Sequence, residues 1–458
     1  MFTKHDIPWS ISEKEASLVK EYLDKALACG ADAARINLAK SMMNLVSLRD
    51  GVPDKVTSSG DIMLSISIFR KGRFASFTTN RLDPEAMGPF IREAVDTVDM
   101  FEADPLRKLP EPRRLCTTAL TGLEMGLYDD AYAAVTPEWR METATKASCF
   151  SKPHGGDYKV ISEETEYSDS VSDLIIADSN GLDVRHIESS FEIGCEYTIA
   201  DRQGHKYSGY WWDAAIRPSD IDFASICPEA LRKAESQIGS TTVPGGKYTM
   251  VVDTEVAAKM VAPILGALGG YSLQQNNSFL TGSLSKKVFS EGFTMMDLPV
   301  SPGECGAKLF DSEGVATAND AVICDGRIDK YFLNTYMAAK MGMAPTVDDC
   351  TRAKVMPWWG LGGSRENITA DDIMSACGEG ILVTGFNGGN FNKVSGDFSY
   401  GIEGFAFKGR VLTPVHGMVV TGNITQLWNN LLAAGSDSRA CRIKQIPTLA
   451  FGNVDFSA

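Results

Sequence analysis

The sequence lacks the paired spacings that a local metal site needs. Its 458 residues include only five histidines, no two of them within eight residues of each other: His5, His154, His186, His205 and His416. None is followed by glutamate, so neither His-Glu-x-x-His nor its one-residue-longer relative occurs. Such motifs bind zinc because they place two imidazoles one helical turn apart. The sequence therefore predicts no metal or other cofactor held by a local motif of this chain, and leaves open a site assembled from residues far apart in the sequence.

Other catalytic signatures are also missing. No Gly-x-x-x-x-Gly-Lys-Ser/Thr phosphate loop occurs, which argues against nucleotide hydrolysis. The segment 397–401 misses the Gly-x-Ser-x-Gly nucleophile elbow because Asp397 occupies the first glycine position. The glycine clusters at 360–363 and 385–389 do not match the dinucleotide fingerprint Gly-x-Gly-x-x-Gly. No catalytic residue can be assigned from these motifs.

Cysteine usage and hydropathy indicate the cellular compartment of the protein. The ten cysteines lie at wide, irregular intervals without a Cys-x-x-Cys pair, which argues against a zinc ribbon or a redox pair. The N-terminus carries no apolar signal core, and no window approaches the roughly 20 apolar residues of a membrane helix. We therefore expect a cytoplasmic protein whose thiols are reduced, mostly buried and free of disulfides.

The charge balance is acidic. There are 44 lysines and arginines against 59 aspartates and glutamates, which gives a formal net charge of −15. No stretch is rich in lysine and arginine, whereas a nucleic-acid-binding surface needs a basic patch. Binding to nucleic acid is not expected.

The first 240 residues predict an α+β region with sub-blocks at about 1–110 and 111–240. Ser12 and Glu15 have capping-box spacing at the start of a helix that ends near Gly30. Alternating apolar residues then indicate antiparallel strands through 34–48 and 62–68, and further helices are predicted at 84–101, at 136–137 onward and at 218–238. An N-terminal helix on antiparallel-sheet layers follows from this order.

A breaker-rich linker at 241–246 separates this region from the rest. The segment 247–458 is rich in glycine and turns, and predicts a mixed β-sheet domain with a few helices. A buried helix is expected at 255–268, a second helix at 424–434 and a final strand at 448–454.

Several segments, taken in order, resemble signatures of one family. They are Asp50-Gly51, 68–78, Phe279-Leu280-Thr281-Gly282-Ser283-Leu284, 310–317 followed by Asp325-Gly326, 395–401, and Thr421-Gly422-Asn423-Ile424. This series is similar to the bacterial TldD/PmbA family, once called modulators of DNA gyrase. It covers nearly the whole chain.

The resemblance implies a two-subunit zinc metallopeptidase. TldD-type chains carry His-Glu-x-x-x-His on a central helix and a zinc-binding cysteine near the C-terminus, whereas TldE (PmbA) chains lack the motif. Here Pro263, Ile264 and Leu268 stand at the motif position, and none of them can bind zinc. Cys441 lies near the place of the third ligand and is either a relic of that site or an ordinary thiol. The resemblance thus places the chain on the TldE side.

The implied partner is a TldD-like subunit that binds the zinc, in a heterodimer or larger assembly. This chain alone is expected to be inactive, and a homodimer is the alternative assembly for the isolated chain. The implied substrates are unfolded or extended peptides. The alternative function is a non-enzymatic binding or regulatory module, as the older family name suggests.

One glycine-rich run has two interpretations. It comprises Gly385, Phe386, Asn387, Gly388, Gly389 and Asn390. Small residues allow a peptide backbone to approach closely, as strand addition requires, so this run is a candidate peptide-proximal loop. It could equally be a tight turn between strands.

Overall fold

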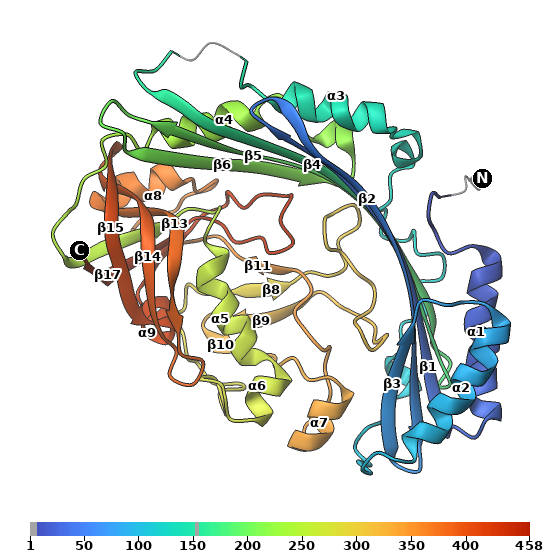
Figure 1. Cartoon of the computed structure of the whole chain (residues 1–458). Coiled ribbons are helices and arrows are strands. Elements are labelled where there is room, and N and C mark those ends of the chain that lie inside the picture. Colours follow the sequence, from blue (N-terminus) through green and yellow to red (C-terminus); the bar gives the residue numbers. More distant parts are fainter. Residues whose placement is uncertain (1–6, 152–154) are drawn as a thin grey trace. The chain divides into compact units, whose positions relative to one another are not determined.

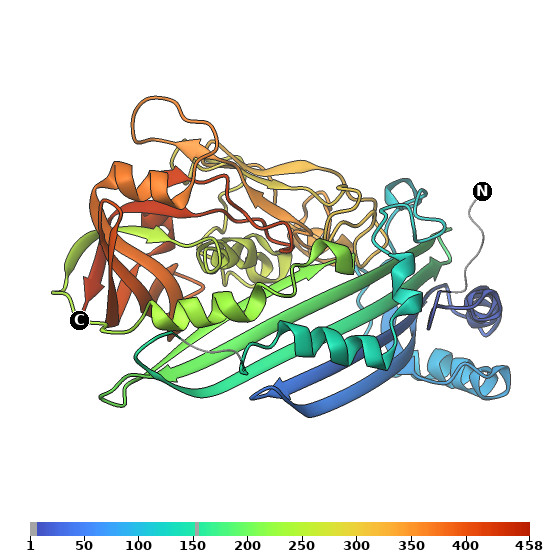
Figure 2. The same ribbon diagram turned by 90° about the horizontal axis from the view of Figure 1, so that it is seen from above.

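The computed structural model describes residues 7–151 and 155–458 (Figures 1 and 2). The chain forms two compact units. Unit 1 takes the described residues up to Glu235 together with Val300–Thr317, and unit 2 takes Ser236–Pro299 and Ala318–Ala458. Residues 300–317 therefore group with the N-terminal part, although the sequence analysis assigned all of 247–458 to the C-terminal domain. The predicted α+β class is confirmed in both units.

Unit 1 contains a six-stranded antiparallel sheet in the order β3-β2-β1-β4-β5-β6. Its strands are β1 (Ala33–Arg49), β2 (Val52–Arg70), β3 (Arg73–Thr79), β4 (Lys159–Asp178), β5 (Asp183–Ala200) and β6 (Lys206–Ala215). β1 pairs with β4 from Arg35↔Asp178 to Arg49↔Glu164. The two sub-blocks predicted for this region therefore share one continuous sheet.

Four helices pack on one face of this sheet (Figure 1). They are α1 (Glu13–Ala28), α2 (Pro84–Val98), α3 (Pro137–Ala147) and α4 (Ile226–Glu235). The even-numbered residues of β1 face the helices. Ala34, Ile36 and Leu38 belong to the core with α1 and α2, and Val46 and Leu48 belong to the core with α3 and α4. The capping box of α1 is confirmed, with Ser12 Oγ accepting from Glu15 N.

The helix predicted at 218–238 is wrong in its extent. The structure has a 3-10 turn, η3 (Pro218–Asp220), and then α4 over only ten residues. Two further 3-10 turns, η1 (Pro112–Arg114) and η2 (Asp130–Ala134), connect α2 to α3. Pro228 within the segment permits a helix because it stands in the first turn of α4.

Unit 2 is built around a small barrel. Its sheet contains β7 (Gly246–Val252), β12 (Trp358–Trp359), β13 (Glu379–Phe391), β14 (Asp397–Lys408), β15 (Val411–Asn423), β16 (Leu431–Ala434) and β17 (Leu449–Ser457). β7 closes the ring, because it pairs in parallel with β13 and antiparallel with β17. Val251 and its two neighbours Met250 and Val252 are consequently buried.

The remaining elements of unit 2 are short. A second sheet contains β8 (Met295–Asp297), β9 (Asp320–Cys324), β10 (Arg327–Ile328) and β11 (Ala353–Val355). The helices are α5 (Ala258–Leu268), α6 (Gly270–Gln274), α7 (Thr335–Met341), α8 (Ala370–Cys377) and α9 (Ile424–Asn429). The helix predicted at 424–434 ends early, because Leu431–Ala434 pairs with β17 as β16.

The expectation of disulfide-free thiols is contradicted. Cys149 and Cys227 form a disulfide across 78 residues of sequence. Linear spacing cannot reveal such a contact, because tertiary packing alone brings α4 beside the end of α3. Of the eight free cysteines, Cys116, Cys195 and Cys350 are buried and five are partly exposed. None of the helices in the described residues is long and apolar enough to span a membrane.

Candidate functional site

The outward face of α5 borders a pocket of about 300 Å³ in unit 2. One wall is formed by the helix itself, and the other by the start of α6, the following loop and strands β13 and β14. The lining residues are Lys259, Ala262, Pro263, Gly266, Ala267, Ser272, Asn277, Phe391, Lys393 and Tyr400. This pocket contains the helix position where the family resemblance implies a degenerate zinc motif.

Only one of the three predicted motif positions faces the pocket. Pro263 lines it, whereas Ile264 and Leu268 are 0% exposed and belong to the core. The same i, i+1, i+5 spacing on the pocket side falls on Ala262, Pro263 and Ala267, one residue earlier. Residues three or four positions apart lie on the same face of a helix. Ala262 and Pro263 therefore share the pocket side of α5 with Lys259 and Gly266, whereas Ile264 and Leu268 do not.

The residues on this face do not fit a zinc ion. Two alanines and a proline offer no nitrogen, sulfur or carboxylate ligand. Cys441 does not line the pocket, and in the described part of the chain it belongs to no group of three or more histidine, cysteine or acidic ligand atoms. Its neighbours Arg439 and Arg442 contact Glu255, at 2.9 and 2.7 Å. We therefore assign no metal chemistry to α5.

The polar groups of the pocket are basic or neutral. Lys259 Nζ lies 4.6 Å from the centre of the Tyr400 ring, and Lys393 contributes a second ammonium to the lining. Burial raises the pKa of the Tyr400 hydroxyl, so it stays protonated at neutral pH. Such a lining suits carbonyl or carboxylate oxygens better than a cation. Neither lysine was predicted as a site residue, although Lys259 precedes Pro263 by one helical turn, and Tyr400 was noted only as part of the family segment 395–401.

A second, more open pocket of about 620 Å³ continues along β13 and β14. It shares Asn277, Phe391 and Lys393 with the first pocket and adds Asn390, Asn392, Asp397, Phe398 and Ser399. The two pockets together form a groove in unit 2 that starts at α5 and follows the end of β13.

The run Gly385–Asn390 lies in this strand and not in a loop, contrary to its description in the sequence analysis. Asn387 pairs with Gly401 and Asn390 with Ser399, so the two glycines between them form a bulge. Gly388 and Gly389 have φ values of +64° and +110°, where glycine is favoured. A Cβ on Gly389 would lie 2.2 Å from the Ser399 carbonyl oxygen.

One edge of β13 is open beyond its first five residues. β7 pairs with β13 only over Ile381–Val383, and β14 occupies the opposite edge. Among the described residues, no strand pairs with the β7 side of β13 from Gly385 to Phe391. An open edge presents backbone donors and acceptors that can pair with an added strand.

Three of the resemblance segments meet beside the groove. Asn423 Nδ2 donates to Ser395 O at 2.8 Å and to Asp397 Oδ1 at 2.9 Å. The Asn423 hydrogen bond keeps the pKa of the Asp397 carboxyl below its ordinary value. Phe279 N donates to Lys393 O at 3.0 Å. The segment 310–317, in contrast, belongs to unit 1, where Arg35 donates to the Glu313 carbonyl at 2.7 Å.

One glycine of α5 and one of α6 give opposite stability predictions. Gly266→Ala is expected to raise the free energy of unfolding by about 0.5–1 kcal/mol, because alanine favours a helix and its Cβ meets nothing within 4 Å. Gly270→Ala should lower it by about 1–3 kcal/mol, since its Cβ would lie 2.9 Å from Met337 Cβ. Urea unfolding of both variants measures the difference. Equal effects would contradict this packing.

Comparisons with known proteins identify the family. Models of the PmbA/TldA metallopeptidase central and C-terminal domains match residues 133–238 and 245–458. A solved structure from Bacteroides thetaiotaomicron, named as a modulator of DNA gyrase, is 34% identical, with a TM-score of 0.91 over 98% of this chain and 100% of its own.

Two further proteins are similar to this chain over nearly its whole length. The metalloprotease PmbA of Escherichia coli O157:H7 is 24% identical over 93% of both chains. TldE from Thermococcus kodakarensis shares the fold, with a TM-score of 0.81 and 18% identity over 96% of this chain and 100% of its own. The resemblance predicted from the sequence is confirmed. The chain belongs to the PmbA/TldD metallopeptidase family.

Proposed function

We propose that this chain is the TldE/PmbA-type subunit of a cytoplasmic heteromeric zinc metallopeptidase and that it contributes to substrate binding. The observation that carries the proposal is the pocket-facing side of α5. Ala262, Pro263 and Ala267 occupy the spacing of the family's zinc motif and supply neither a metal ligand nor a general base. A TldD-type partner would bind the zinc and activate the attacking water.

The groove supports an extended peptide as the substrate. The open edge of β13 from Gly385 to Phe391 can pair with a peptide backbone, whatever the peptide's sequence. At the α5 end of the groove, Lys259 and Lys393 provide positive charge for carbonyl or carboxylate oxygens. A folded protein has few free backbone groups, so this mode favours unfolded or extended chains.

The test is a cleavage assay with an unstructured peptide. It uses this chain alone, the TldD-type partner alone, and both together, in a zinc-containing buffer. We expect cleavage by the mixture and none by this chain, because the chemistry depends on the partner's zinc. Changing the partner's motif glutamate to glutamine should abolish the activity. Cleavage by this chain alone would overturn the proposal.

A variant of this chain tests the groove separately. Gly266→Trp places a large side chain in the pocket without a backbone clash, since nothing lies within 4 Å of the new Cβ. It should raise the KM of the pair while leaving association unchanged, and Gly246→Trp, at the exposed start of β7, is the control. Association itself should bury about 1,000 Å² or more of surface. A KM unchanged by Gly266→Trp in a pair that still forms would remove the groove from the proposal.

A further inference from the structure

One buried carboxylate in unit 1 lacks a cation. Glu163 on β4 is 0% exposed, and it forms no ion pair with any lysine, arginine or histidine of the described residues. Three other carboxylates of unit 1 with fully buried side chains each pair with an arginine: Asp169 with Arg140, Asp173 with Arg185, and Asp178 with Arg35. Buried charges are normally paired in this way or bind a metal. Glu163 is therefore the exception that requires a reason.

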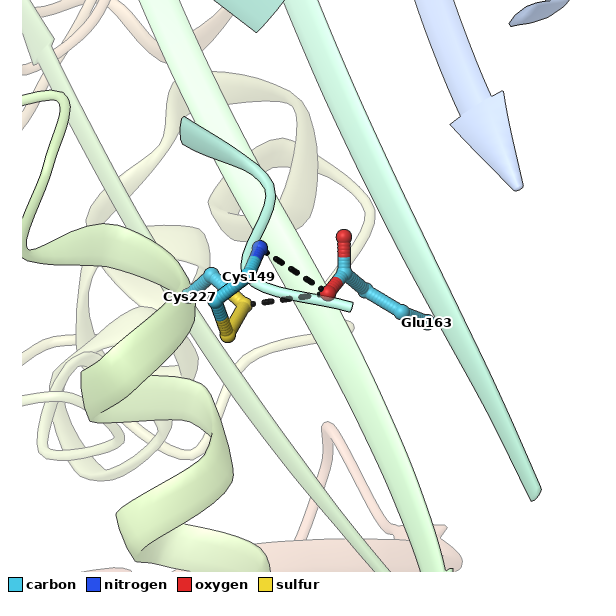
Figure 3. Close-up of side chains that lie close together, drawn as sticks. All are labelled: Cys149, Glu163 and Cys227. Carbon is cyan, nitrogen blue, oxygen red and sulfur yellow. Dashed lines mark hydrogen bonds between the residues drawn. A yellow bond between two sulfur atoms is a disulfide. The ribbon is translucent and has the colours of Figure 1, made fainter. Parts of the chain in front are cut away.

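The neighbours of Glu163 are neutral. Ser148 Oγ and Thr165 Oγ1 donate to Oε1 at 2.5 and 3.0 Å, and Cys149 N donates to Oε2 at 3.1 Å. Cys227 Sγ lies 3.2 Å from the same oxygen, and Figure 3 shows the disulfide beside the carboxylate with one of its sulfurs facing it. A disulfide sulfur has no hydrogen to donate, so it cannot hydrogen-bond to the carboxylate, whereas a thiol can donate to it and a thiolate can share a cation with it.

The three residues form a donor set for a thiophilic cation. Their ligand atoms all lie within 4.8 Å of one another, and all three residues are buried. Two cysteine sulfurs and a carboxylate oxygen are ligands that zinc accepts. Cys149 follows α3, Glu163 lies on β4 and Cys227 on α4, so one ion would connect three elements of unit 1.

We propose that the reduced protein binds a divalent thiophilic cation, Zn²⁺ above all, through Cys149, Glu163 and Cys227. The disulfide is the oxidised, metal-free state of the same site. This proposal is independent of the peptidase function. It also revises the expectation that the chain holds no metal, while leaving α5 in unit 2 without one.

The two states are linked by a balanced reaction. A dithiol reductant gives two electrons and two protons to the disulfide, forms its own disulfide, and leaves two thiols at Cys149 and Cys227. The incoming cation displaces both thiol protons to solvent. The metal form carries −1 overall, from two thiolates, one carboxylate and a doubly charged ion. The oxidised form has the same net charge, but there the Glu163 carboxylate has no cation to offset it.

Cobalt titration of the full chain tests the proposal. Protein reduced with a phosphine and stripped by a chelator is titrated anaerobically with Co²⁺. We expect one Co²⁺ per chain, with thiolate-to-cobalt charge-transfer absorption and the visible bands of tetrahedral cobalt, both lost when Zn²⁺ is added. Protein oxidised to the disulfide should show neither signal, and reduction should restore them. This comparison needs no variant.

Substitutions then identify the ligands. Cys149→Ser, Cys227→Ser and Glu163→Gln should each weaken Co²⁺ binding by at least about tenfold. Cys116→Ser removes another buried thiol of unit 1 and should have no effect, and circular dichroism verifies that each variant is folded. Absence of a thiolate–cobalt band in the reduced chain, or its survival in both cysteine variants, would overturn the proposal. So would a disulfide that resists reduction in the native protein, because it would then be permanent and structural.

Discussion

Replacing Arg140 with leucine is expected to lower the free energy of unfolding by about 3–5 kcal/mol, because it leaves a charged Asp169 buried without a cation. Arg140 donates to both Asp169 oxygens, from Nε at 2.5 Å and from Nη2 at 3.1 Å. The Asp169 side chain is fully buried, and the Arg140 side chain is only 12% exposed. Asn44 and Tyr167 also donate hydrogen bonds to Asp169, at 2.9 and 3.0 Å, but they carry no charge.

Urea unfolding followed by circular dichroism measures this loss, and two controls define it. Arg232→Leu breaks a close ion pair with Glu229 in which the arginine is 63% exposed, and should cost less than about 1 kcal/mol. The double variant Arg140→Leu/Asp169→Leu should be more stable than Arg140→Leu alone, because it removes the stranded charge. If the single Arg140 variant were as stable as the Arg232 variant, the buried pair would have no role in stability.

Trp428→Ala should destabilise unit 2 by about 3–5 kcal/mol, the usual cost of emptying a large buried aromatic site. The indole is 0% exposed, stacks on Phe293 with 3.7 Å between ring centroids, and meets Phe451 edge-on at 5.3 Å. Its Nε1 donates to the Met260 carbonyl of α5 at 3.1 Å. The substitution therefore leaves a cavity and also leaves the Met260 carbonyl of α5 without this donor.

Differential scanning calorimetry and urea unfolding measure the effect. Tyr271→Ala is the control, since Tyr271 is 63% exposed and its loss should change stability by no more than about 0.5 kcal/mol. Trp428→Phe should be milder than Trp428→Ala, because it keeps most of the packing and loses only the hydrogen bond. A Trp428→Ala variant within 1 kcal/mol of the unchanged protein would contradict the central place of this side chain in the core.

Local features of the sequence were sufficient for much of the fold. Ser12 and Glu15 located the start of α1, because a capping box depends on residues only three positions apart. Alternation of apolar residues found β1 and the second half of β2, since the side chains of a strand alternate between two faces. The family resemblance rested on ordered motifs, and three of them lie together beside the groove.

Other features were decided only by contacts between distant residues. The sequence could not show which face of α5 would be exposed, so two of its three predicted motif positions turned out to be buried. The open edge of β13 depends on where β7 stops pairing with it, more than 100 residues away in sequence.

The same limit applies to Cys149, Glu163 and Cys227, which carry no sequence signature. Nothing in their spacing suggests a site, because 78 residues separate the two cysteines. They meet because α4 and the end of α3 pack on the same face of the sheet that contains β4. The sequence by itself determined many of the elements, the family and the absence of the zinc motif. Tertiary packing alone decided which side chains share a surface, since that depends on burial and contact at long range.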